Sequence, residues 1–204
     1  MPEHPLVFVG IVALLTITPG ADMAMVARSV FIGGRRDAFA TTLGISAGCF
    51  VWACASALGV AAVLAASQTA YDALRLVGAV YLIWLGVQSL LAARRGVAPA
   101  ADAAHARGNP FRQGLLTNLF NPKIAVFYST FLPQFIGPGD SALAVSMLLA
   151  CVHIAFGIAW LSLYAWLLAR AVEAFKGSRL RRALDALTGT VLIALGLRLA
   201  TERR

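Results

Sequence analysis

Long stretches without any charged residue alternate with short polar connections along this chain. Six such stretches cover residues 6–21, 38–71, 76–93, 124–139, 141–169 and 186–197. Most approach or exceed the roughly 20 residues that a helix needs to cross the hydrocarbon core of a bilayer. The pattern predicts an all-α protein with six transmembrane helices. Because the last stretch is the shortest, a chain with five spans is the alternative.

Proline interrupts otherwise apolar sequence at matching places in the two halves of the chain. The first interruption is Thr18-Pro19-Gly20 and the second is Asn121-Pro122-Lys123. Threonine and asparagine are good N-cap residues, and proline is favoured at the first position of a helix. We therefore expect the first and fourth transmembrane helices to be broken at Pro19 and Pro122 and to restart inside the membrane.

A charged residue lies within three positions of each proline. Asp22 and Lys123 are the only charges well inside the predicted spans, where a charge costs roughly 2.5 to 3.5 kcal/mol on insertion scales. Helices broken in corresponding places of two halves indicate the binding site of a transporter. The predicted substrate-binding residues, with no catalytic or metal-ligating residue among them, are Thr18, Pro19, Gly20, Asp22, Asn118, Asn121, Pro122, Lys123 and Gln134.

Lys123 and the free N–H groups of a restarted helix suit a carboxylate, whereas Asp22 suits an ammonium group or a coupling proton. Two simpler interpretations stay open at this point. The prolines could only kink their helices, and the two charges could form a structural pair.

His153 could relay protons or simply hydrogen-bond to a neighbour. The pair Gly44 and Gly48 suits close helix packing, either within the fold or between subunits.

The composition agrees with a membrane protein, since 60% of the 204 residues are hydrophobic and 13% are charged, with a mean hydropathy of +0.79. The net charge of +8 does not indicate a nucleic-acid partner, because most of the 17 basic residues lie in alternate connections, beginning with Arg28. The positive-inside rule places these connections in the cytoplasm and both chain ends outside. Arg198 and the basic C-terminus disagree and favour five spans.

The two halves also share a short sequence. Leu82-Ile83-Trp84-Leu85-Gly86 matches Leu192-Ile193-Ala194-Leu195-Gly196 at four of five positions. If each half holds three spans, the second half must enter the membrane upside down. The sequence therefore predicts one transmembrane domain built from two inverted three-helix repeats, residues 1–95 and 113–204. Residues 96–112 form the predicted cytoplasmic linker.

Several motifs along nearly the whole chain resemble the LysE/RhtB family of amino-acid exporters. They are Thr18-Pro19-Gly20, Gly44-x-x-x-Gly48, the segment 78–86, the segment 114–123 and Leu132-Pro133-Gln134-Phe135. Ala21 departs from the pattern, because many relatives carry a second proline there.

This resemblance implies a multi-pass protein of the bacterial inner membrane that exports amino acids or their derivatives, coupled to protons. The threonine, homoserine and lysine efflux branch is the nearest description, and neither an enzyme activity nor a cofactor is implied. The expected partners are a small amino acid, protons and the lipid bilayer, and a homo-oligomer is left open. The alternatives are a heavy-metal exporter of the same superfamily, for which only Asp22 and His153 are available as ligands, and a membrane assembly subunit that transports nothing.

Overall fold

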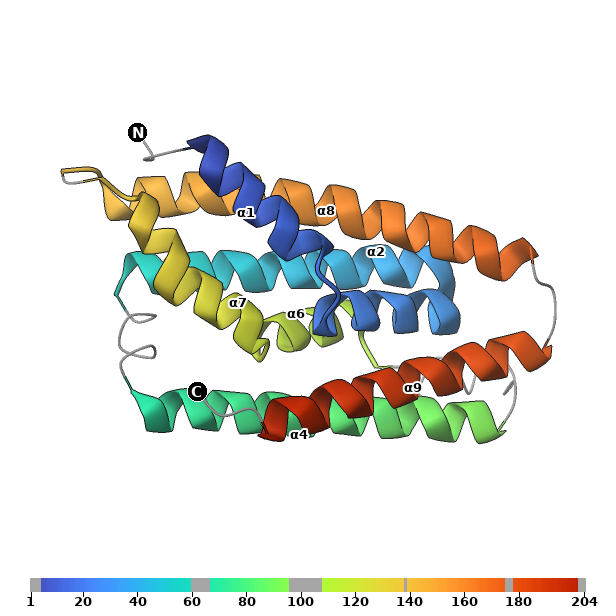
Figure 1. Cartoon of the computed structure of the whole chain (residues 1–204). Helices are drawn as coiled ribbons and strands as arrows, with labels where there is room; N and C mark the ends of the chain where they lie inside the picture. The colour runs from blue at the N-terminus through green and yellow to red at the C-terminus, as the bar shows by residue number, and fades with distance from the viewer. Residues whose placement is uncertain (1–4, 60–66, 96–107, 138, 175–177, 202–204) are drawn as a thin grey trace.

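A computed structural model describes residues 5–59, 67–95, 108–137, 139–174 and 178–201, and these residues form helices and no strand. The two halves of the chain interleave in space (Figure 1). The helices are α1 (Pro5–Ile17), α2 (Ala21–Ala57), α4 (Gln68–Arg95), α6 (Pro110–Leu119), α7 (Pro122–Val126), α8 (Ala142–Ala174) and α9 (Ser178–Thr201). A π-helical turn, Phe127–Phe131, and a 3₁₀ turn, Leu132–Phe135, continue the path of α7.

Helix α2 is a hairpin of two arms, residues 21–33 and 35–57. Gly34 separates the arms with a φ of 76°, a left-handed conformation that glycine adopts at little cost. The arms lie side by side in Figure 1, and the hydroxyls of Ser29 and Thr41 join them at 2.7 Å. The first arm therefore continues the path of α1, and the second arm returns through the molecule.

The two predicted helix breaks are present. Helix α1 ends at Ile17 and α2 begins at Ala21, while α6 ends at Leu119 and α7 begins at Pro122. The predicted cap at Asn121 is present, since its side chain accepts a hydrogen bond from the backbone N–H of Lys123 at 3.1 Å.

The predicted cap at Thr18 is wrong. Its hydroxyl donates back to the Leu14 carbonyl at 2.6 Å, and the first arm of α2 starts after Gly20, whose backbone is extended at a φ of −173°. Proline at position 19 therefore lies in the connection between two helices and not in the first turn of the second one. The hydroxyl of Thr18 satisfies the end of α1 instead of the start of α2.

Small residues allow the second arm of α2 to pack closely on α6. A methyl group added to Gly44 would overlap the Phe111 carbonyl, and one added to Gly48 would overlap the Asn118 side chain. Gly114 of α6 is equally close to the backbone of Thr41. In a bilayer such close backbone approach holds helices together, because lipid tails are as apolar as leucine. The Gly44 and Gly48 face is therefore used within the fold.

Helices α4 and α9 pack against each other through the two copies of the repeated sequence. A methyl group on Gly86 would meet the Gly189 carbonyl oxygen and the Ile193 side chain, and one on Gly196 would meet the Ala79 carbonyl oxygen and the Ile83 side chain. The two sets of contacts correspond: Gly189 and Ile193 stand to Gly86 as Ala79 and Ile83 stand to Gly196, with the same spacing along the sequence. Reciprocal contacts of this kind are what a two-fold axis produces.

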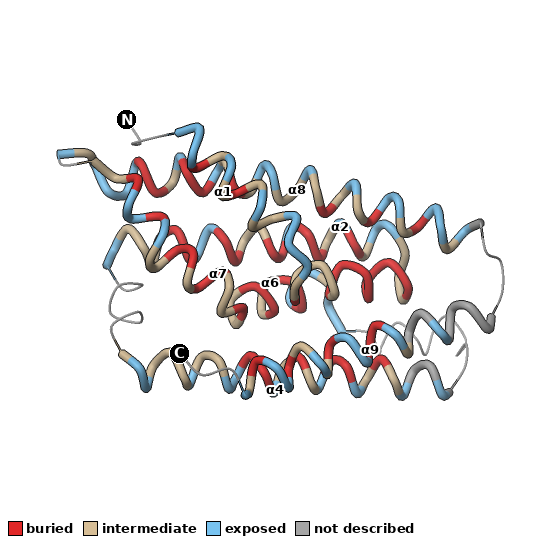
Figure 2. The backbone as a smooth tube through the Cα atoms, viewed as in Figure 1, coloured by how far each residue is buried: buried red, intermediate tan, exposed pale blue. Residues whose placement is uncertain are grey.

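Three of the described helices are long and apolar enough to cross a membrane: Ala21–Ala57, Gln68–Leu91 and Ala142–Glu173. Pro5–Ile17 and Ala186–Thr201 are shorter apolar helices. Figure 2 shows exposed residues on the outer faces of the helices, and many of them are large and apolar, such as Leu6 at 85%, Leu14 at 71% and Val80 at 67% exposure. An apolar outer surface of this extent suits lipid.

Many of the basic residues lie at one end of the molecule. The Gly34 turn, the ends of α4 and α8 and the start of α9 lie toward the same end of the molecule (Figure 1). Basic residues mark these places in the sequence, including Arg35 and Arg36 after Gly34. Part of the predicted linker, residues 96–107, lies outside the described residues, and its last three residues, 110–112, already belong to α6.

Candidate functional site

The two helix breaks meet where Lys123 crosses from the second half of the chain to the first. Its ammonium group donates hydrogen bonds to the carbonyl oxygens of Leu15 at 3.2 Å and Thr18 at 3.0 Å. The Leu15 carbonyl would normally pair with the N–H four residues later, but that residue is Pro19, which has none. Lys123 thus supplies a donor that the proline removed from α1, and each such charged hydrogen bond contributes about 1.5 to 3 kcal/mol.

Asp22 lies in the first turn of α2, where the positive end of the helix dipole favours a carboxylate. Its Oδ2 accepts a hydrogen bond from Asn118 Nδ2 at 3.0 Å, so it also connects the two halves of the chain. Its Oδ1 is buried and has no hydrogen-bond partner among the described residues. The carboxylate therefore keeps an acceptor available for a further donor.

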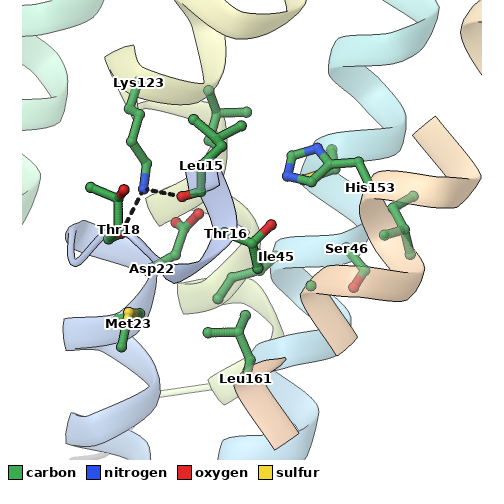
Figure 3. Close-up of a pocket in the computed structure, with 14 residues that line it drawn as sticks. Leu15, Thr16, Thr18, Asp22, Met23, Ile45, Ser46, Lys123, His153 and Leu161 are labelled. Carbon is green, nitrogen blue, oxygen red and sulfur yellow. Dashed lines mark hydrogen bonds between the residues drawn. The ribbon is translucent and has the colours of Figure 1, made fainter. Parts of the chain in front are cut away.

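Asp22 and Lys123 line one small cavity of about 40 Å³. In Figure 3 Lys123 extends toward the end of α1, with Asp22 beside that end and His153 projecting from α8 on the other side. Both charges have partners other than each other, namely backbone carbonyls for Lys123 and Asn118 for Asp22. Each charge thus has hydrogen-bond partners of its own besides the opposite charge that lines the same cavity.

His153 is buried, with 5% of its surface exposed, and it lines the same cavity. Its Nδ1 lies 3.1 Å from the hydroxyl of Tyr128, which is fully buried. The structure confirms that this histidine has a hydrogen-bonded neighbour, and its place at the cavity of Asp22 leaves a role in proton relay as a prediction.

A second, larger cavity lies on the other side of Lys123. It is an open groove of about 630 Å³ whose walls come from α1, α4, α7 and α9. Thr18 and Lys123 line both cavities, and so they form part of the wall between them. Two polar residues that were not predicted as site residues also line the groove, Tyr71 and Arg198.

The structure brings most of the predicted site residues together. Thr18, Pro19, Gly20, Asn121, Pro122 and Lys123 line the groove, and Asp22 lines the small cavity with Thr18 and Lys123. Asn118 is fully buried behind them and reaches the site through its bond to Asp22. Gln134 lines neither cavity, because its side chain is exposed and donates to the Thr130 carbonyl at 2.7 Å.

Arg28 lies in a different place from the one that the charge pattern predicts. It is buried inside the first arm of α2, with 5% exposure, instead of lying in a cytoplasmic connection. Its Nε donates to Ser89 at 2.8 Å and one of its terminal nitrogens donates to Gln113 at 3.1 Å. A count of charges along the sequence cannot distinguish a buried arginine with partners from a solvated one.

The described residues offer little to a metal ion. No three histidine, cysteine, aspartate or glutamate side chains come together among them in a way that could hold one. Cys49 lines the small cavity together with Asp22 and His153, and its sulfur atom lies 3.5 Å from Asn118 Nδ2.

An apolar helical chain in which two broken helices meet around buried charges has the features of a membrane transport protein. The family model described as LysE type translocator matches residues 13–203. The chain belongs to this family of translocators.

Relatives with efflux in their names cover nearly the whole chain. The threonine efflux protein of Escherichia coli strain K12 is 30% identical over 96% of this chain and 95% of its own length. The homoserine/homoserine lactone efflux protein of Salmonella typhimurium is 30% identical over 93% and 92%. The uncharacterized membrane protein YrhP of Bacillus subtilis is 27% identical over 95% and 96%. No solved structure matches the chain.

Proposed function

We propose that this protein is a secondary transporter that exports amino acids or amino-acid derivatives across the bacterial inner membrane and is coupled to protons. The observation that carries the proposal is the meeting of both helix breaks at one site, where Lys123 offers a cation and Asp22 an unpaired carboxylate oxygen. A zwitterion has the complementary pair of charges. The names of the threonine and homoserine efflux relatives support the same class of substrate.

The proposal includes six membrane crossings arranged as two inverted repeats. Helix α1 with the first arm of α2 would make the first crossing, and α6 with α7 and the turns after it would make the fourth. The second arm of α2, α4, α8 and α9 would supply the others. The reciprocal contacts of Gly86 and Gly196 support this arrangement, because a two-fold axis between antiparallel helices lies in the membrane plane of an inverted repeat.

Fusions to a reporter enzyme that is active only outside the cytoplasm test this topology. We expect activity after Gly139 and after Arg204, and no activity after Ala101, because the basic helix ends should stay in the cytoplasm. Each fusion protein should be compared at matched abundance by immunoblotting. An inactive fusion at Arg204 would mean that α9 does not cross, and activity at Ala101 would reverse the whole orientation.

Transport in inside-out membrane vesicles tests the function itself. Vesicles from a host that lacks its own amino-acid exporters should accumulate labelled amino acids when respiration acidifies their interior, and a protonophore should abolish the accumulation. Vesicles without the protein are the control. Accumulation that persists with the protonophore would remove the proton coupling, and cadmium accumulation without any amino acid would favour the heavy-metal alternative.

A further inference from the structure

The groove beside Lys123 extends well beyond the two helix breaks. From Pro19 and Pro122 it continues between the turn after α7, the start of α4 and the end of α9, where Tyr71 and Arg198 line it. Its volume of about 630 Å³ lies within the range of pockets that bind small organic molecules. A substrate held at Lys123 could therefore place its side chain in this groove.

Most of the groove wall is apolar. The apolar side chains that line it come from α1, α4, α7, the π-helical turn and α9, and they include Leu14, Leu82, Val126, Phe131 and Leu195. Such a wall favours an aliphatic or aromatic side chain, because the removal of apolar surface from water is favourable. It offers few partners to a polar side chain.

The charges of the groove have one sign. Lys123 and Arg198 line it, and no carboxylate is among the described residues that do so. Two of the three donors on the Lys123 ammonium are bound to the carbonyls of Leu15 and Thr18, which leaves one for a ligand. Asp22, which can attract an α-ammonium group, lines only the small cavity on the other side of Thr18.

We infer that the groove holds the side chain of the transported amino acid and that Arg198 is a specificity-determining residue that rejects cationic side chains. The substrates are then amino acids with uncharged apolar side chains, with the α-carboxylate at Lys123. A lysine side chain would meet the Arg198 guanidinium in an apolar groove without a described counter-charge, and like charges across a binding site are strongly unfavourable. This inference rests on the proposed function.

Competition in inside-out vesicles tests the inference. Uptake of labelled L-leucine should be inhibited by unlabelled L-phenylalanine at about a tenfold lower concentration than by L-lysine. Arg198→Glu should reduce this ratio about tenfold by making L-lysine a better competitor, and Arg198→Gln should give an intermediate value. Arg170→Glu is the matched control and should leave the ratio unchanged, because Arg170 stacks on Trp166 of α8 at 5.0 Å and does not line the groove.

Each outcome decides a separate question. If L-lysine competes as well as L-phenylalanine, or if Arg198→Glu leaves their ratio unchanged, the role of Arg198 is wrong while the exporter function stands. If the vesicles accumulate no amino acid at all, the proposed function is wrong as well. If Arg198→Glu alters uptake of both amino acids equally, and only in vesicles rich in phosphatidylglycerol, the groove binds anionic lipid and the inference is overturned.

Discussion

Replacing Lys123 with alanine is expected to reduce the export rate by about a hundredfold or more, because the substrate carboxylate would lose a cation in a poorly solvated site. The same change removes the donor that serves the carbonyls of Leu15 and Thr18 at the end of α1. Unpaired carbonyls in the membrane are costly, so the melting temperature of the purified protein should fall as well. Transport should be measured per molecule, with abundance determined by immunoblotting.

Lys123→Arg is the informative companion of this variant. It keeps the positive charge and can still donate to backbone carbonyls, so it should recover most of the thermal stability. Its longer, planar head cannot occupy the same place beside Gly20, which lies next to the lysine ammonium, so export should recover only in part. Normal export by Lys123→Ala would show that this residue has only a structural role.

Replacing Asp22 with asparagine is expected to abolish proton-driven accumulation while leaving the protein abundant. Asparagine has nearly the same shape, and its oxygen can still accept the hydrogen bond from Asn118. It cannot ionise, so it can neither carry a proton through the cycle nor attract an ammonium group by charge. The expected loss is about a hundredfold in uptake by inside-out vesicles.

Asp72→Asn is the matched control for this variant. Asp72 lies on α4 and pairs with Arg75 at 3.4 Å, so its neutralisation should leave transport unchanged. The double variant Asp22→Asn with Lys123→Ala separates a transport site from a structural pair. Recovery of both abundance and export in the double variant would contradict the roles given to the two charges, and continued loss of export would agree with them.

The sequence predicted the places where the helices break, because proline removes a backbone donor wherever it occurs. It also predicted the cap at Asn121. It could not predict the cap at Thr18 correctly, since threonine can bond forward to a new helix or back to the old one, and the extended backbone of Gly20 decides between them. Local patterns thus locate a break but do not define its geometry.

The contacts between the two halves of the chain could not be predicted from the sequence. The bond from Lys123 to the Leu15 carbonyl joins residues more than a hundred positions apart, and only the packed fold brings them together. Arg28 and Arg198 show the same limit in another form. In the sequence, both entered the argument only as positive charges that indicate the orientation of the chain. In the structure, Arg28 donates hydrogen bonds to Ser89 and Gln113 in the interior, and Arg198 lines the groove.

The reciprocal packing of α4 and α9 has an energetic consequence for the working cycle. The contacts of one helix are repeated by its partner, so an asymmetric movement of the pair would loosen one copy of the contact while tightening the other. Two arrangements of the α4 and α9 pair, in which the loosened and the tightened contact change places, would then have nearly equal packing energy. If the protein is the proton-coupled exporter proposed above, such a balance would let the binding of substrate and proton decide which of its two opposite states is populated.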